Sequence, residues 1–72
     1  MYRTQLTAEM ASAVAQRKPF ESTHEGITYI IWYYQGAIPV ITVTSPTGKV
    51  LVEKLASDKP EILAEVLMLA AS

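Results

Sequence analysis

Large apolar or aromatic side chains fill the run Ile-Thr-Tyr-Ile-Ile-Trp-Tyr-Tyr at positions 27–34, apart from one threonine. Successive side chains of a strand point to opposite faces. One face of this strand therefore carries Ile30, Trp32 and Tyr34, and the other carries Tyr29, Ile31 and Tyr33. A sheet covered on one side needs only one apolar face, so this pattern predicts a strand that is covered on both.

Two further segments rich in β-branched residues follow, so strands are predicted over about 27–35, 40–45 and 49–55. The segment Ser45-Pro46-Thr47-Gly48 is typical of a hairpin turn, because proline suits its second position and glycine accepts a positive φ. Short connections predict an antiparallel meander. Residues 20–26 are polar apart from Phe20 and are interpreted as the connection into the first strand.

Helices are predicted at both ends of the chain. The first runs to about Lys18 before Pro19, with an inward stripe of Leu6, Met10, Ala13 and Val14. The second begins with Asp58 and Glu61 in the spacing of a capping box, with Pro60 in its first turn. Its apolar face consists of Ile62, Leu63, Val66, Leu67, Leu69 and Ala70. The chain is therefore predicted to be a single α+β domain over residues 1–72, of order αβββα, with both helices packed on one face of the three-stranded meander.

The turns also predict the strand register. Placing Ser45 opposite Lys49 sets Val43 across from Leu51 and Thr42 across from Val52, while a two-residue loop at positions 36–37 sets Trp32 beside Ile41. The core face then carries Ile30, Trp32, Ile41, Val43 and Leu51, with Leu55 nearby. The opposite face carries Tyr29, Ile31, Tyr33, Val40, Thr42, Thr44, Val50, Val52 and Lys54. A slip of one residue would exchange these faces.

Self-association is the function that this pattern favours. A chain of 72 residues without cysteine sits near the lower size limit for a self-sufficient core. Two helices can cover only one side of the sheet, which leaves the other side available to a second copy or to another protein. The predicted interaction surface consists of Tyr29, Ile31, Tyr33, Val40, Thr42, Val50 and Val52. We expect a non-catalytic interaction or regulatory protein that forms a homodimer.

The remaining residues indicate no catalytic chemistry. His24 is the only histidine, and a zinc site of the helical type would need a second one at position 28, which is threonine. Gly48-Lys49 lacks the upstream glycine and the following helix of a phosphate loop. No enzyme activity, metal or cofactor is therefore predicted. The apolar stretches are shorter than a membrane span and the amino terminus does not resemble a signal peptide, so we expect a cytoplasmic protein that does not enter a membrane.

The predicted order of helix, three strands and helix is similar to the topology of the double-stranded-RNA-binding domain. That family contacts phosphates with lysines at the start of its last helix and with a polar loop between its first two strands. Here the corresponding segments are Ser57-Asp58-Lys59-Pro60-Glu61 and Gly36-Ala37-Ile38. With six basic and seven acidic residues the net charge is −1, which does not favour a nucleic-acid partner. A weak nucleic-acid-binding module is the alternative function.

Overall fold

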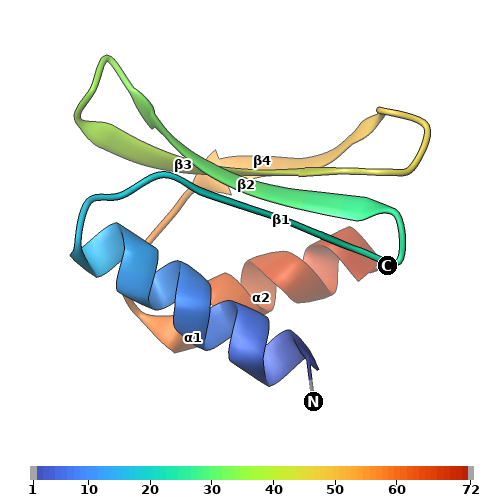
Figure 1. The fold of residues 1–72 in the computed structure, drawn as a ribbon, viewed down its shortest axis with the longest axis horizontal. Coiled ribbons are helices and arrows are strands. Elements are labelled where there is room, and N and C mark those ends of the chain that lie inside the picture. The colour runs from blue at the N-terminus through green and yellow to red at the C-terminus, as the bar shows by residue number, and fades with distance from the viewer. Residues whose placement is uncertain (1, 72) are drawn as a thin grey trace.

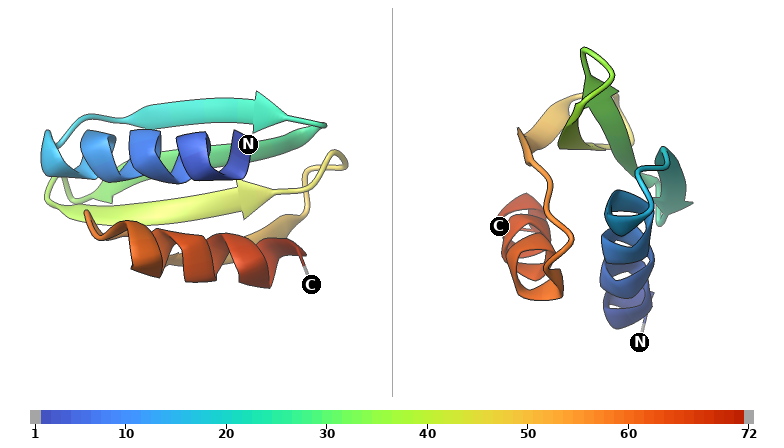
Figure 2. Two further views of the ribbon diagram at one scale, coloured as in Figure 1. Left: turned by 90° about the horizontal axis from the view of Figure 1, so that it is seen from below. Right: turned by 90° about the vertical axis from the view of Figure 1, so that its left-hand side faces the viewer.

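The fold consists of helices packed against one antiparallel sheet, in a computed structural model that describes residues 2–71. The elements within this range are, in chain order, α1 (Tyr2–Ala15), β1 (Phe20–His24), β2 (Ile27–Tyr34), β3 (Ile38–Thr44), β4 (Val50–Leu55) and α2 (Pro60–Ala71). The strands lie side by side in the order β1-β2-β3-β4. Figures 1 and 2 show α1 and α2 next to each other beneath the same face of the sheet. The predicted α+β class is confirmed.

The three-stranded meander is wrong, because the segment interpreted as a connection forms β1. This strand pairs with β2 from Phe20 opposite Ile31 to His24 opposite Ile27. The turn between them is Glu25-Gly26, and both residues have positive φ, 54° and 83°, as a tight two-residue hairpin turn requires. β1 lacks the hydrophobic signal of a strand because it lies at the sheet edge, where alternate side chains are only half-buried. The order αββββα also departs from the double-stranded-RNA-binding topology.

The pairing of β2 with β3 differs by one residue from the prediction. Tyr34 pairs with Ile38, so the loop contains Gln35, Gly36 and Ala37 rather than two residues. Trp32 consequently lies opposite Val40, and Ile31 takes the position opposite Ile41. Since side chains alternate along a strand, this shift exchanges the two faces of β2 relative to β3.

The turn between β3 and β4 is as predicted, but a bulge follows it. The Ser45 amide donates to the Lys49 carbonyl at 2.8 Å, which confirms their opposed positions. Thr44 then pairs with Val50, whereas Val43 pairs with Val52, so that Leu51 is an extra residue between the two pairs. The predicted pairings of Val43 with Leu51 and of Thr42 with Val52 are therefore wrong by one residue.

The core lies between the sheet and the helices, and it reverses the predicted faces of β2 and β4. The sheet contributes Tyr29, Ile31, Ile41, Val43 and Val52; α1 contributes Leu6, Met10, Ala11 and Val14; and α2 contributes Leu63, Val66 and Leu67. The assignment of Ile41 and Val43 to the core is confirmed. The prediction that Ile30, Trp32 and Leu55 belong to the core face is wrong: these side chains face away from the helices, because the longer loop and the bulge each shift the register by one residue. Leu51, also predicted to be core, is the extra residue of the bulge and is 38% exposed.

Two side-chain hydrogen bonds, from Tyr33 and from Arg17, connect the end of α1 with β2 and with the β2–β3 loop. The chain leaves this helix through Arg17, whose φ is 55°, and the Lys18 amide donates back to the Ala13 carbonyl at 2.9 Å. The Tyr33 hydroxyl on β2 donates to the Lys18 carbonyl at 2.9 Å. Arg17 Nη2 donates to the carbonyl of Ala37 in the β2–β3 loop at 2.7 Å. The chain then enters β1 at Phe20, which pairs with Ile31 of β2.

The start of α2 differs by one residue from the predicted capping box. The Lys59 carbonyl accepts the first bonds of the helix, from the Ile62 amide at 3.1 Å and the Leu63 amide at 3.3 Å. Lys59 is therefore the capping residue, and Asp58 lies one position outside the helix. Pro60 is the first helical residue, where the missing amide hydrogen removes no bond.

Candidate interaction surface on the open sheet face

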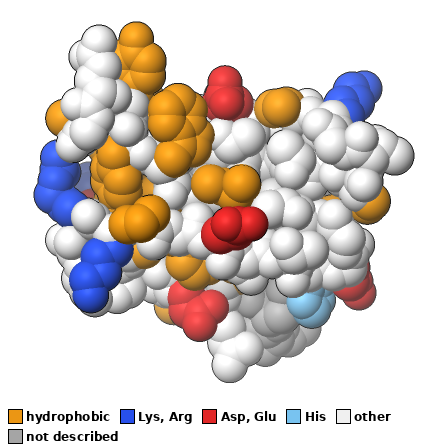
Figure 3. All heavy atoms as spheres, turned by 45° about the horizontal axis from the view of Figure 1, so that its top comes forward, with side chains coloured by type: hydrophobic (Ala, Val, Ile, Leu, Met, Phe, Trp, Pro, Cys, Tyr) orange, Lys and Arg blue, Asp and Glu red, His pale blue; other side chains and the backbone are white. Residues whose placement is uncertain are grey.

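The face of the sheet that points away from the helices carries a cluster of exposed apolar side chains. Residues paired across antiparallel strands lie on the same face, so Trp32, Val40 and Leu55 form one row and Tyr34 and Ile38 form the next. We call these five residues the open-face patch. Leu55 is 67% exposed, Tyr34 50%, Ile38 43% and Trp32 38%. Figure 3 shows apolar side chains gathered at the end of this face that holds the β2–β3 loop.

Hydrogen bonds hold the indole of Trp32 against the sheet. Its Nε1 donates to Thr42 Oγ1 at 2.8 Å, and Thr42 Oγ1 donates to a carboxylate oxygen of Glu53 at 3.1 Å. The chain of bonds therefore crosses β2, β3 and β4 on the open face. Trp32 also meets the ring of Tyr34 edge to face, with centroids 6.3 Å apart and planes at 63°. The indole of Trp32 is thus held against the sheet by a hydrogen bond and against Tyr34 by a ring contact.

Carboxylates form the row next to the open-face patch. Glu21 on β1 pairs with Ile30, and Ile30 pairs with Thr42, which pairs with Glu53. The open-face positions of the strands include no lysine or arginine, since Lys54 pairs with Ile41 on the helix side. Figure 3 shows acidic side chains beside the apolar cluster and basic ones at its outer border. An apolar centre with a charged and polar rim is the usual composition of a protein interface.

The residues predicted as an interaction surface do not share one face. Three of them, Tyr29, Ile31 and Val52, are buried on the face that packs against the helices. Tyr33 is half-buried on the same face, and its hydroxyl donates to the Lys18 carbonyl just after α1. Val40 and Thr42 lie on the open face, and Val50 is 52% exposed beside the bulge. The prediction that these side chains form one exposed face is therefore wrong. The cause is the register, because the β2 and β4 side chains were assigned to the wrong sides.

The sequence reasoning missed Trp32, Tyr34, Ile38 and Leu55 as exposed residues. One signal could have corrected it: Glu25-Gly26 is a two-residue hairpin sequence of the kind that permits positive φ. Recognising it would have paired Glu21 with Ile30 and placed a carboxylate on the face of Trp32. A charged residue in that row favours solvent over the core.

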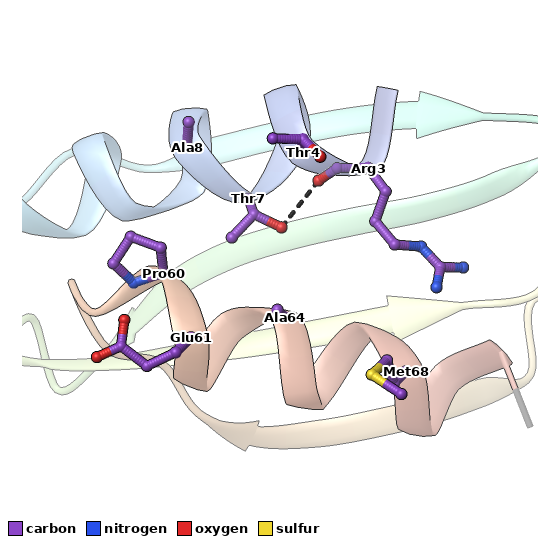
Figure 4. Close-up of a pocket in the computed structure, with 8 residues that line it drawn as sticks. All are labelled: Arg3, Thr4, Thr7, Ala8, Pro60, Glu61, Ala64 and Met68. Atoms are coloured by element: carbon purple, nitrogen blue, oxygen red, sulfur yellow. Dashed lines mark hydrogen bonds between the residues drawn. The ribbon is translucent and has the colours of Figure 1, made fainter. Parts of the chain in front are cut away.

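A groove between the helices is a concave surface on the side of the molecule opposite the open face. Its volume is about 780 Å³, and it is lined by Arg3, Thr4, Thr7 and Ala8 of α1 and by Pro60, Glu61, Ala64 and Met68 of α2. Figure 4 shows Glu61 and Pro60 at one end and Arg3 and Met68 at the other. Thr7 Oγ1 donates to the Arg3 carbonyl at 2.8 Å, so that hydroxyl is engaged within α1.

Candidate reactive groups are dispersed over the molecule. His24 is the last residue of β1 and pairs with Ile27, far along the sheet from the open-face patch. Within residues 2–71 no three histidine or acidic side chains gather in a way that could hold a metal ion. Neither helix in this range has the length and apolar character that crossing a membrane requires. No protein-family model, curated protein or solved structure matches this chain.

Proposed function

We propose that this protein is a small, non-catalytic interaction protein that self-associates through the open-face patch. The observation that carries the proposal is the exposure of Trp32, Tyr34, Ile38 and Leu55 on adjoining rows of one sheet face. A contiguous apolar surface of this kind is unfavourable in water, and soluble proteins that retain one commonly cover it with a partner. A regulatory role would follow if association competes with binding to another protein.

The composition of the patch suits a protein partner. Tryptophan and tyrosine are enriched among the residues that contribute most to interface affinity, and Trp32 and Tyr34 are here already in contact. The partly buried Trp32 is held by its bond to Thr42, so little side-chain entropy remains to be lost on binding. The patch is therefore organised for contact with a complementary apolar surface.

A second copy of the chain is the occupant that we propose. The accessible surface of the molecule is 4622 Å². A standard interface covers about 800 Å² per partner, which corresponds to about a sixth of that surface. A dimer would also bury both faces of β2, in accordance with its two-sided apolar sequence. Stability and association would then be linked, as in other small dimers.

Sedimentation equilibrium of the wild-type chain tests the proposal. We expect a dimer whose dissociation is observed on dilution, accompanied by a red shift in the emission of Trp32, the only tryptophan in the chain. The shift is expected because dissociation returns the indole to water. A monomer at about 100 μM with unshifted emission would contradict the proposal, because a dimer of functional affinity would be populated at that concentration.

Titration with labelled duplex RNA and single strands tests the alternative of a nucleic-acid-binding module. Such modules combine aromatic platforms with cations, whereas the strands place Glu21 and Glu53 on the open face. We expect no saturable binding tighter than about 10⁻⁵ M at low salt. Tight binding that weakens steeply with salt, and that Trp32→Ala abolishes, would replace the proposed function with this alternative.

A further inference from the structure

A hollow in the surface lies beside Trp32, where the chain enters β1. Its volume is about 360 Å³, and it is lined by Pro19, Phe20, Glu21, Ile30, Ile31 and Trp32. Glu21 pairs with Ile30, which is two residues before Trp32 on β2, so Glu21 and Trp32 stand on the open face. Both of these side chains are exposed. The hollow therefore combines a tryptophan ring, one carboxylate and otherwise apolar walls.

Trp32 presents its ring, and not its polar group, to the hollow. The Nε1 hydrogen is the only polar group of this side chain, and it is donated to Thr42 Oγ1 at 2.8 Å. Thr42 lies on β3 and Glu21 lies on β1, so the strand order puts the hydrogen bond and the hollow on opposite sides of Trp32. Trp32 is 38% exposed. A cation in the hollow would therefore meet the π electrons of the ring.

A ring, a carboxylate and apolar walls together match the chemistry of an arginine side chain. We infer that the hollow binds an arginine of a partner protein, with the guanidinium on the ring of Trp32 and its N–H groups donating to the Glu21 carboxylate. Tryptophan attracts cations more strongly than the other aromatic rings, and a guanidinium both stacks on rings and donates in pairs to carboxylates. The aliphatic stem of arginine packs against the apolar walls.

Charge identifies the occupant as a second protein with a basic residue. The open-face positions of the strands carry Glu21 and Glu53 and no lysine or arginine. The open face of a second copy therefore supplies no strand cation to the hollow, and the phosphates of a nucleic acid would be repelled by the carboxylates. A segment in which arginine stands next to apolar residues satisfies both the Glu21 carboxylate and the adjoining open-face patch.

The arginine site goes beyond self-association and does not depend on it. Trp32 belongs both to the hollow and to the open-face patch, so the arginine-bearing partner and a second copy compete for the same side chain. Binding of one then lowers the apparent affinity for the other, which links the oligomeric state to the partner.

Titration with a model peptide tests the recognition of the charge. The probe is the tripeptide Leu-Arg-Leu, acetylated and amidated at its ends, and the matched control carries citrulline, which has the shape of arginine without its charge. The indole N–H resonance of Trp32, the only tryptophan, reports binding. We expect a dissociation constant of about 1 mM for the arginine peptide and binding at least about fivefold weaker for the citrulline peptide. Equal binding of the two peptides, or no shift with either, would overturn the inference.

Neutralising Glu21 tests the role of the carboxylate. Glu21→Gln keeps the size of this exposed side chain, and we expect it to weaken binding of the arginine peptide about threefold to fivefold while leaving the citrulline peptide unaffected. Glu25→Gln is the matched control, because it makes the same change in the β1–β2 turn, outside the lining of the hollow. A loss with Glu25→Gln as large as with Glu21→Gln would show an effect of net charge alone and contradict the site.

The two proposals fail in different ways. The peptide titration is repeated on Ile38→Thr, which removes apolar area from the open-face patch outside the lining of the hollow and so weakens a dimer that would cover Trp32. A wild-type monomer that prefers the arginine peptide contradicts only self-association. A wild-type dimer whose Ile38→Thr variant binds the arginine and citrulline peptides equally contradicts only the arginine site.

Discussion

Gly26 in the β1–β2 turn lies against Pro46 in the β3–β4 turn: a Cβ placed on Gly26 would come within 2.9 Å of Pro46 Cγ. Figure 1 shows these two turns at the same end of the molecule. The contact connects the β1–β2 turn, which the sequence pattern did not predict, with the β3–β4 turn, which it did. Glycine at position 26 therefore permits both the positive φ of the hairpin turn and the close approach of Pro46.

Replacing Gly26 with alanine is expected to destabilise the protein by about 1–3 kcal/mol, because φ of 83° is strained for alanine and the new methyl group meets Pro46. Urea unfolding measures the loss. Gly36→Ala is the matched control, since Gly36 also has positive φ but nothing lies within 4 Å of its Cβ position. Equal losses of unfolding free energy in the two variants would show that a clash with Pro46 does not contribute to the cost at position 26.

Removing the Tyr33 hydroxyl is expected to cost about 1 kcal/mol, because Tyr33→Phe loses the bond to the Lys18 carbonyl at the end of α1. Amide hydrogen exchange should increase in the last turn of that helix. Tyr34→Phe is the control on the next residue, where the side chain is half-exposed and points to the open face. We expect its stability to change by less than about 0.5 kcal/mol. A larger effect at Tyr34 than at Tyr33 would contradict the assignment of the two faces.

Val52→Lys and Leu51→Lys test the bulge directly, since the two residues are adjacent but differ in environment. Val52 is 7% exposed beneath the helices, whereas Leu51 is 38% exposed. Lysine at position 52 would leave a charge or a desolvated amine in the core, so we expect a loss of about 3 kcal/mol or more. The same change at position 51 should cost less than about 1 kcal/mol. Thermal unfolding followed by circular dichroism measures both losses. A larger loss for Leu51→Lys than for Val52→Lys would support the register predicted from the sequence and contradict the bulge.

Leu55→Glu is expected to weaken self-association at least about tenfold while leaving the monomer folded, because Leu55 lies in the open-face patch and is largely exposed. Sedimentation velocity measures association, and circular dichroism measures the fold. Leu69→Glu introduces the same charge at a 54% exposed position on α2 and should leave association unchanged. If Leu69→Glu alone dissociates the dimer, the interface lies on α2 and not on the sheet.

Local sequence signals determined most of the elements. The helical spacing of Leu6, Met10 and Val14, the apolar run of β2 and the Ser45-Pro46-Thr47-Gly48 turn each depend on neighbours within a few residues, so they were readable without the structure. The α+β class followed from their order. The strand β1 was not predicted, because a half-buried edge strand needs few apolar residues. Its alternating pattern in Phe20–His24 is too short and too polar to indicate a strand.

The candidate surface was decided by tertiary structure alone. Both faces of β2 are apolar, so hydrophobicity could not show which one meets the helices, and a single extra loop residue at Gln35 was enough to exchange them. The bulge at Leu51 then reversed β4 in the same way. Register is set by how the four strands and two helices fill one core together, and in that packing Ile31, Ile41 and Val52 are the buried side chains. The sequence by itself determined that apolar side chains would remain outside the core, and only packing selected Trp32, Tyr34 and Leu55 as those side chains.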